Sequence, residues 1–254
     1  MNPSIIDIHI HPICSEPHLL DAAAAAAPHY GVTTICLLGD VLAFGDCPSE
    51  DEIQKINNNT IEIVNINPDL YLGFCYLNPE HSGTFINAEI ERCVCEHGFR
   101  GIKLEVAVKA CDKRLDPVME KACELDIPVL HHAWYKTVGQ GENESTPADI
   151  AVLASRHPET TIIMAHIIGC GIRGIEDVKQ YTNVYFDTSG SQPEAGIIEY
   201  AVREIGSERI LYGSDVPYRD FSAQIAKVTG AEISESQKKD ILFSNAQKLL
   251  GIEV

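Results

Sequence analysis

Short apolar runs rich in β-branched residues recur along the chain, and a stretch of helical character follows most of them. Eight runs are predicted to be strands, at residues 5–10, 33–38, 71–77, 101–104, 128–131, 161–165, 184–187 and 210–213. Successive starts lie one strand-plus-helix unit apart. Most runs are continuously apolar rather than alternating, which is typical of parallel strands buried on both faces.

Helix starts are predicted between these runs. Two capping boxes and two cap–proline pairs are present: Ser49 with Glu52, Ser234 with Gln237, Asp116 with Pro117, and Thr146 with Pro147. Eight strand–helix units in 254 residues favour a (β/α)8 TIM barrel that forms one domain over residues 1–254. An extra C-terminal helix, near residues 235–250, is expected to close the outside of the barrel.

A doubly wound open sheet is the alternative fold. Such a sheet would place a glycine-rich phosphate turn after the first strand. The sequence there is HIHPICSEP, which contains no glycine. The barrel is therefore preferred.

The first predicted strand carries three polar residues at alternate positions: Asp7, His9 and His11. Alternation puts them on one face, which should point into the barrel, with the isoleucines turned toward the helices. A bound cation would satisfy both imidazoles, and the alternative is a hydrogen-bonded histidine network. Asp7 is expected to orient the two histidines from behind.

Other strand ends add residues that bind metals. The fifth strand ends in either His131 or His132, the sixth ends on His166, and the eighth ends on Asp215. The carboxyl ends of barrel strands meet at one face, where active sites form. Imidazoles with one carboxylate suit Zn²⁺, with Mn²⁺, Fe²⁺ and Co²⁺ as alternatives.

The ordered set of motifs resembles the amidohydrolase superfamily, within the amidohydrolase-related group that includes aminocarboxymuconate-semialdehyde decarboxylase. The resemblance is carried by IDIHIHP, GFRGIKLE, IPVLHHAW, IIMAHIIGCG, ILYGSDVPY and ILFSNAQKLLG, which extend nearly from end to end of the chain. It implies a metal-dependent barrel enzyme. The implied metal ligands are His9, His11, Lys103, His132, His166 and Asp215.

The resemblance also implies roles. The fifth-strand ligand normally follows Pro-Val by three positions, which selects His132. His166 either binds a second metal or hydrogen-bonds the metal water, and Asp215 touches the metal and moves a proton. A carboxylated Lys103 would bridge two ions, whereas a Lys103 paired with Glu105 or Asp215 leaves one. Glu105 stands where relatives often carry histidine, and it is an alternative ligand.

The predicted reaction is hydrolysis of an amide, lactone or ester. Metal-activated water would attack the carbonyl, Asp215 would shuttle the proton, and His166 would help stabilise the oxyanion. The alternative is non-oxidative decarboxylation of a small aromatic or unsaturated acid, and a non-catalytic ligand-binding barrel is the third candidate. A decarboxylase would need a cation for the substrate carboxylate and an aromatic wall. The short chain favours the hydrolase, because decarboxylating relatives tend to carry longer insertions.

Two residues are predicted to bind substrate: Trp134, in the polar loop after the fifth strand, and Arg173, after the sixth. The partner is expected to be a small molecule. A net charge of −18 excludes nucleic acid and anionic membranes as favoured partners. Nine cysteines without a CxxC pair, together with a start unlike a signal peptide, favour the cytoplasm. A homo-oligomer is a further expectation that the sequence does not decide.

Overall fold

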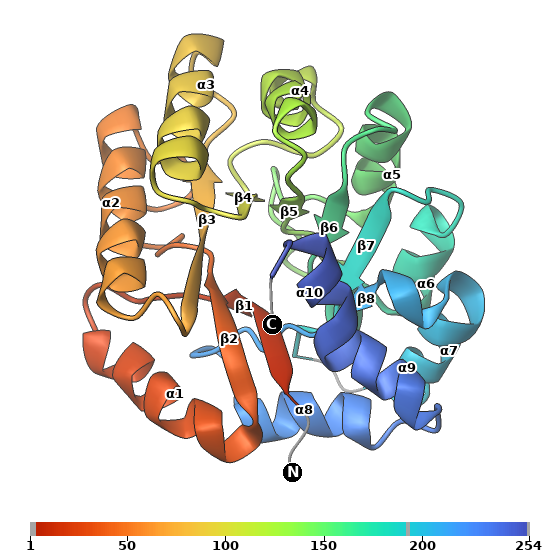
Figure 1. The fold of residues 1–254 in the computed structure, drawn as a ribbon. Coiled ribbons are helices and arrows are strands. Elements are labelled where there is room, and N and C mark those ends of the chain that lie inside the picture. The colour runs from red at the N-terminus through yellow and green to blue at the C-terminus, as the bar shows by residue number, and fades with distance from the viewer. Residues whose placement is uncertain (1–3, 192–193, 253–254) are drawn as a thin grey trace.

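Eight parallel strands form one sheet in the computed structural model, which describes residues 4–191 and 194–252 (Figure 1). They are β1 Ile5–Ile10, β2 Val32–Leu37, β3 Tyr71–Leu77, β4 Gly101–Leu104, β5 Val129–His131, β6 Ile162–Met164, β7 Val184–Asp187 and β8 Ile210–Leu211. Each strand pairs with the next in sequence. The ring closes where the Ile8 N–H donates to Tyr212 O at 3.0 Å and the Asp215 N–H donates to His9 O at 2.8 Å. The predicted (β/α)8 barrel is confirmed.

Helices surround the strands (Figure 1). They are α1 Pro17–Tyr30, α2 Glu50–Ile66, α3 Gly83–Glu91, α4 Asp116–Glu124, α5 Pro147–Arg156, α6 Ile167–Val178, α7 Ile197–Ile205, α8 Phe221–Thr229, α9 Glu235–Lys239 and α10 Asn245–Leu249. The capping boxes predicted at Ser49 and Ser234 open α2 and α9. Pro147 occupies the first turn of α5, as its sequence predicts.

Two apolar clusters make up the core. The larger one joins strands to the surrounding helices, and the smaller one unites Ile6 and Ile8 of β1 with Leu130, Ile163 and Leu211 of other strands. The prediction that these isoleucines face the helices is therefore wrong for Ile6 and Ile8. Strict alternation fails because the pairing of β1 with β2 shifts register between Asp7 and Ile10.

The C-terminal helix occupies a different place from the predicted one. Lys248 of α10 shares a cavity with Pro128 and Thr161, which precede β5 and β6, and Ala246 packs into the smaller apolar cluster. Because these positions mark the amino ends of the strands, α10 covers that end of the barrel rather than its outside. The carboxyl ends stay open on the opposite face.

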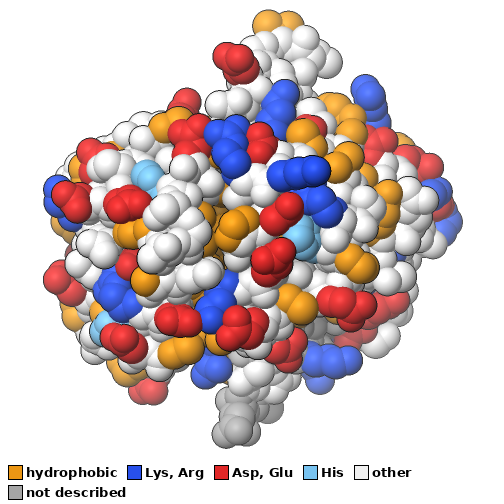
Figure 2. Space-filling model, turned by 90° about the horizontal axis from the view of Figure 1, so that it is seen from above, with side chains coloured by type: hydrophobic (Ala, Val, Ile, Leu, Met, Phe, Trp, Pro, Cys, Tyr) orange, Lys and Arg blue, Asp and Glu red, His pale blue; other side chains and the backbone are white. Residues whose placement is uncertain are grey.

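The surface carries charges of both signs. Figure 2 shows one side of the barrel, where acidic and basic side chains are interspersed and hydrophobic ones are scattered. All nine cysteines are free thiols. Among residues 4–191 and 194–252, no helix has both the length and the apolar character needed to cross a membrane. The cytoplasmic location and a homo-oligomer stay predictions.

Candidate metal centre

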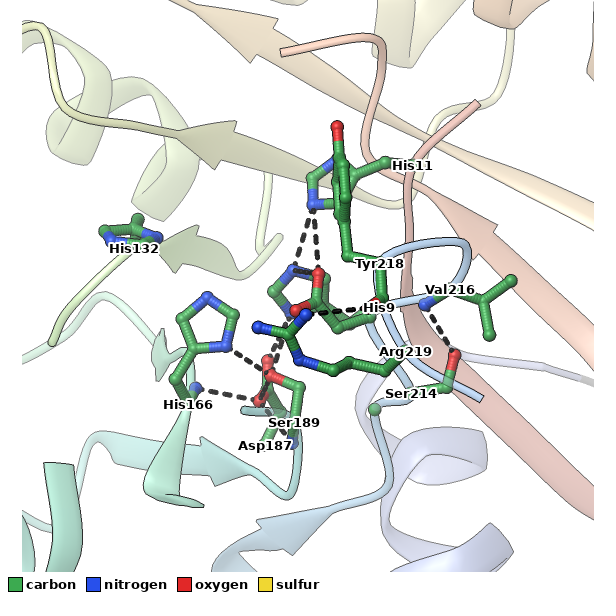
Figure 3. Close-up of polar contacts among 12 residues, drawn as sticks. His9, His11, His132, His166, Asp187, Ser189, Ser214, Val216, Tyr218 and Arg219 are labelled. Carbon is green, nitrogen blue, oxygen red and sulfur yellow. Dashed lines mark hydrogen bonds and ion pairs between the residues drawn. The ribbon is translucent and has the colours of Figure 1, made fainter. Parts of the chain in front are cut away.

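His9 in β1, His11 directly after this strand and Asp215 after β8 lie close together at the carboxyl end of the barrel. Figure 3 shows the two histidines. Nε2 of His9 lies 3.1 Å from Nε2 of His11. Asp215 Oδ1 lies 3.8 Å from the first nitrogen and 3.9 Å from the second. All three residues are buried. Ligands held at roughly 2.1 Å from one ion lie about 3–3.5 Å apart, so a small inward movement would let these atoms share a cation.

The hydrogen bonds of the two rings turn their lone pairs toward each other. His9 Nδ1 donates to Asp187 Oδ2 at 2.7 Å, and His11 Nδ1 donates to Gly39 O at 3.1 Å, because carboxylate and carbonyl oxygens only accept. Burial lowers the pKa of His11 to about 3, so this ring is neutral near pH 7. Two nitrogen lone pairs 3.1 Å apart repel each other unless a positive charge lies between them. The donor set therefore fits a divalent cation.

Asp187, at the end of β7, is a site residue that the sequence analysis missed. Besides the His9 ring, it accepts hydrogen bonds from the backbone N–H of His166 at 2.9 Å and of Ser189 at 3.0 Å, and from the Ser189 hydroxyl. Burial raises the pKa of Asp187, but His9 and these donors outweigh burial and lower it overall. The sequence did contain a signal for Asp187: the seventh predicted strand, VYFD, ends on a carboxylate, and the eighth predicted strand likewise leads to Asp215.

Asp7 does not orient the histidine rings. Its Oδ1 accepts the backbone N–H groups of His9 and Ser214, each at 3.0 Å. Asp7 therefore fixes the chain where β1 meets the segment after β8, while Asp187 holds the His9 ring. This corrects the role expected from the sequence.

His166 and Asp215 both adopt left-handed backbone conformations, with φ of 65° and 63°. Such a conformation costs about 1–2 kcal/mol for a residue with a side chain, and it is typical of functional positions. The hydrogen bonds of the two backbone N–H groups, to Asp187 and to His9 O, offset part of this cost. The His166 Nδ1–H donates to Ser189 Oγ at 2.8 Å, because the Ser189 hydroxyl is already donated to Asp187. The remaining ring nitrogen of His166 is therefore an acceptor.

The structure places His132 in the pocket but outside the group of three. Its Nδ1 lies 3.5 Å from Glu105 Oε2, and its Nε2 lies 3.0 Å from Glu144 Oε1. Lys103 continues this chain of charges inside the barrel, with Nζ 2.7 Å from Glu105 Oε1. His131 is fully buried, and its Nδ1 donates to His132 O. Of the two adjacent histidines, His132 is thus the one beside the candidate metal centre.

Several of these residues line a cavity of about 230 Å³ that has both polar and apolar residues in its lining. The lining residues are His11, Val41, Leu42, Glu105, His132, Trp134, His166, Asp215, Tyr218 and Arg219. The Trp134 ring lies 4.8 Å from the His166 ring. The lining also includes one arginine, Arg219, and two aromatic residues, Trp134 and Tyr218.

Trp134 lies where the sequence predicts a substrate contact, but Arg173 does not. The Arg173 guanidinium is stacked 4.4 Å from the centre of the Tyr135 ring, and the residue is exposed outside the cavity. Arg219, after β8, is the arginine that lines the pocket. The sequence places both arginines after strands, and only the packing of the loops separates them.

The amidohydrolase family model matches residues 6–252. The chain belongs to the amidohydrolase family. This membership places it among metal-dependent enzymes, as the motifs had implied, and leaves the reaction to be decided.

Three similar proteins bear on that question. A gamma-resorcylate decarboxylase from Polaromonas sp. is 26% identical over 84% of this chain and 80% of its own length. A 2-keto-4-carboxy-3-hexenedioate hydratase from Sphingobium sp. is 31% identical over 43% of this chain, and the match spans 31% of the hydratase. A solved dihydroxybenzoic acid decarboxylase from Polaromonas sp. JS666, with bound manganese, has a TM-score of 0.78 and 21% identity over 99% of this chain and 98% of its own.

The prediction of hydrolysis is wrong. The relative that aligns along most of this amidohydrolase family member is a decarboxylase, and so is the solved structure. Histidines and an aspartate around a cation serve both reactions, so the motifs could not separate them. Chain length did not separate them either, since the decarboxylase structure aligns over nearly all of both chains.

Proposed function

We propose that the protein is a metal-dependent, non-oxidative decarboxylase of a small aromatic or unsaturated carboxylic acid. The observation that carries the proposal is the lining of the pocket, in which His11 and Asp215 of the candidate metal centre lie in one cavity with the aromatic side chains of Trp134 and Tyr218. A flat acid would direct its carboxylate to the candidate metal centre and its ring to these aromatic side chains. The decarboxylase relative supports the same reading.

Asp215 is the proposed proton donor. A divalent cation held by His9, His11 and Asp215 would anchor the substrate carboxylate and withdraw electrons from it. Asp215 Oδ1 faces the two imidazoles, which leaves Oδ2 to carry a proton toward the substrate. Burial raises the pKa of the Asp215 carboxyl above its ordinary value, and a bound cation would act in the opposite direction.

The proposed step moves one proton and breaks one carbon–carbon bond. The Asp215 proton is transferred to the carbon that bears the carboxylate, and the bond between that carbon and the carboxylate then breaks. The electron pair of this bond returns to the ring, CO₂ leaves, and water restores the proton to Asp215. His166 has its Nδ1 tied to Ser189 and presents its other ring nitrogen as a hydrogen-bond acceptor for a substrate hydroxyl.

The expected result is CO₂ release from a hydroxylated aromatic acid by the metal-loaded protein. γ-Resorcylate, other hydroxybenzoates and unsaturated acids form the substrate panel, and CO₂ is followed by a coupled assay with product identified by chromatography. Protein stripped of metal by a chelator serves as the control. No CO₂ from any acid of the panel, with metal demonstrably bound, would contradict the proposal.

One divalent ion per chain is expected, since Lys103 Nζ lies 2.7 Å from Glu105 Oε1 and is paired with that carboxylate. Elemental mass spectrometry of the purified protein decides between Zn²⁺, which the donor set suggested, and Mn²⁺. His11→Ala should lose the ion, whereas His132→Ala should weaken its binding less, because His132 faces Glu144. Equal losses in the two variants, or two ions per chain, would count against this arrangement.

A further inference from the structure

Two basic side chains beside the pocket have no acidic partner. Arg219 lies in the segment between β8 and α8, and Lys227 lies on α8. Among the described residues, no carboxylate oxygen lies within 4.0 Å of either charge. The chain has 37 acidic and 19 basic residues, and its partly buried Arg92 and Arg156 each pair with a carboxylate. Among the described residues, the partly buried Arg209 also has no ion pair, but its guanidinium donates to backbone oxygens from Nε, Nη1 and Nη2.

The hydrogen bonds of these cations go to neutral oxygens. Arg219 Nη1 donates to Tyr218 O at 2.7 Å, and its buried Nε has no acceptor in the described structure. Lys227 Nζ donates to Gly190 O at 2.8 Å and to Gln224 Oε1 at 2.6 Å. Partly buried charges without a counter-ion are costly. Both cations thus keep attraction for an anion.

Arg219 and Lys227 line one cavity of about 410 Å³ next to the candidate metal centre. Arg219 also lines the smaller pocket that contains Asp215 and His166, so the two cavities share this residue. The carboxylate in the lining, Asp220, accepts hydrogen bonds from Ser222 and Ala223 as the cap of α8. Burial, and then the charge of Arg219, lower the pKa of Lys227 to about 8, so it remains mostly charged at pH 7.

We propose that Arg219 and Lys227 form a lateral subsite that binds a second carboxylate of the substrate. The subsite rests on the proposed function in one respect: the first carboxylate of the substrate would lie at the candidate metal centre. The Arg219 guanidinium and the Lys227 ammonium line the same cavity, and both groups can bind a carboxylate. The enzyme should then prefer dicarboxylic to monocarboxylic aromatic acids.

Binding of two unreactive ligands tests the subsite. Isothermal titration calorimetry on the metal-loaded full chain compares isophthalate, which has two carboxylates, with benzoate, which has one. The native protein should bind isophthalate about tenfold more tightly. Lys227→Met should remove most of this preference through weaker isophthalate binding, and Arg219→Gln should also reduce it.

Lys238→Met is the matched control, because it removes one positive charge from α9, where Lys238 pairs with Glu235 at 2.9 Å. It should keep the tenfold preference. Thermal unfolding of each variant checks folding. No preference in the native protein, or an unchanged preference in Lys227→Met, would overturn the subsite, as would inorganic phosphate that competes equally with both ligands. Absent CO₂ release with a retained preference would count only against decarboxylation.

Discussion

Asp215→Asn is expected to lower the rate of CO₂ release by about 10³-fold or more while the protein still folds and binds metal. Asparagine keeps an oxygen that can face His9 and His11, so the candidate metal centre survives in weakened form. The asparagine amide cannot donate the proton that replaces the carboxylate on the substrate carbon. General acid catalysis by one positioned group is worth roughly 10²–10⁴-fold, and a lost charge next to the cation adds to this.

The measurement combines the rate of CO₂ release at saturating substrate with metal content by mass spectrometry. Asp51→Asn makes the same chemical change on the exposed first turn of α2 and should leave the rate unaltered. Turnover at the native level in Asp215→Asn would remove Asp215 from the proton transfer. A variant without metal would instead show that Asp215 acts mainly as a ligand.

Much of the barrel could be predicted because its signals are local. Strand runs at 5–10, 71–77, 101–104 and 184–187 coincide with β1, β3, β4 and β7, and the other four differ at one or both ends by one or two residues. Strand ends also locate His9, His11, His166 and Asp215, since every parallel strand of a barrel delivers its last residues to the same face.

What the sequence could not supply depends on distant partners. His131 ends β5 and His132 follows it, and the orientation of His132 is decided by Glu144, twelve residues later. Asp187 matters because it accepts a hydrogen bond from the His9 ring, although the two residues lie 178 positions apart in the sequence. The place of α10 depends on packing at the amino end of the barrel. The reaction class could not be predicted from the ligand motifs, because histidines and an aspartate around a cation serve both reactions.

Lys103→Met is expected to destabilise the protein by about 3–5 kcal/mol at pH 7, the usual cost of leaving one member of a buried ion pair alone. Lys103 is fully buried, and Glu105, 2.7 Å away, has a side chain only 12% exposed. Urea unfolding measures the loss. Lys179→Met breaks an exposed pair with Glu176 and Glu204 and should cost less than about 1 kcal/mol.

The dependence on pH has a definite sign. Burial alone would raise the pKa of Glu105, but Lys103, with smaller effects of His132 and His11, lowers it from 4.5 to about 2. The stability contributed by the ionised Glu105 is therefore present above pH 4.5 and is lost as the pH falls toward 2. The difference in unfolding free energy between native protein and Lys103→Met should be smaller at pH 4 than at pH 7, because the unpaired Glu105 carboxyl becomes protonated at a higher pH.

The Lys103→Met, Glu105→Gln double variant should regain most of the lost stability at pH 7, since neither charge of the pair remains. A double variant no more stable than Lys103→Met would show that the ammonium stabilises the barrel by some contact other than Glu105.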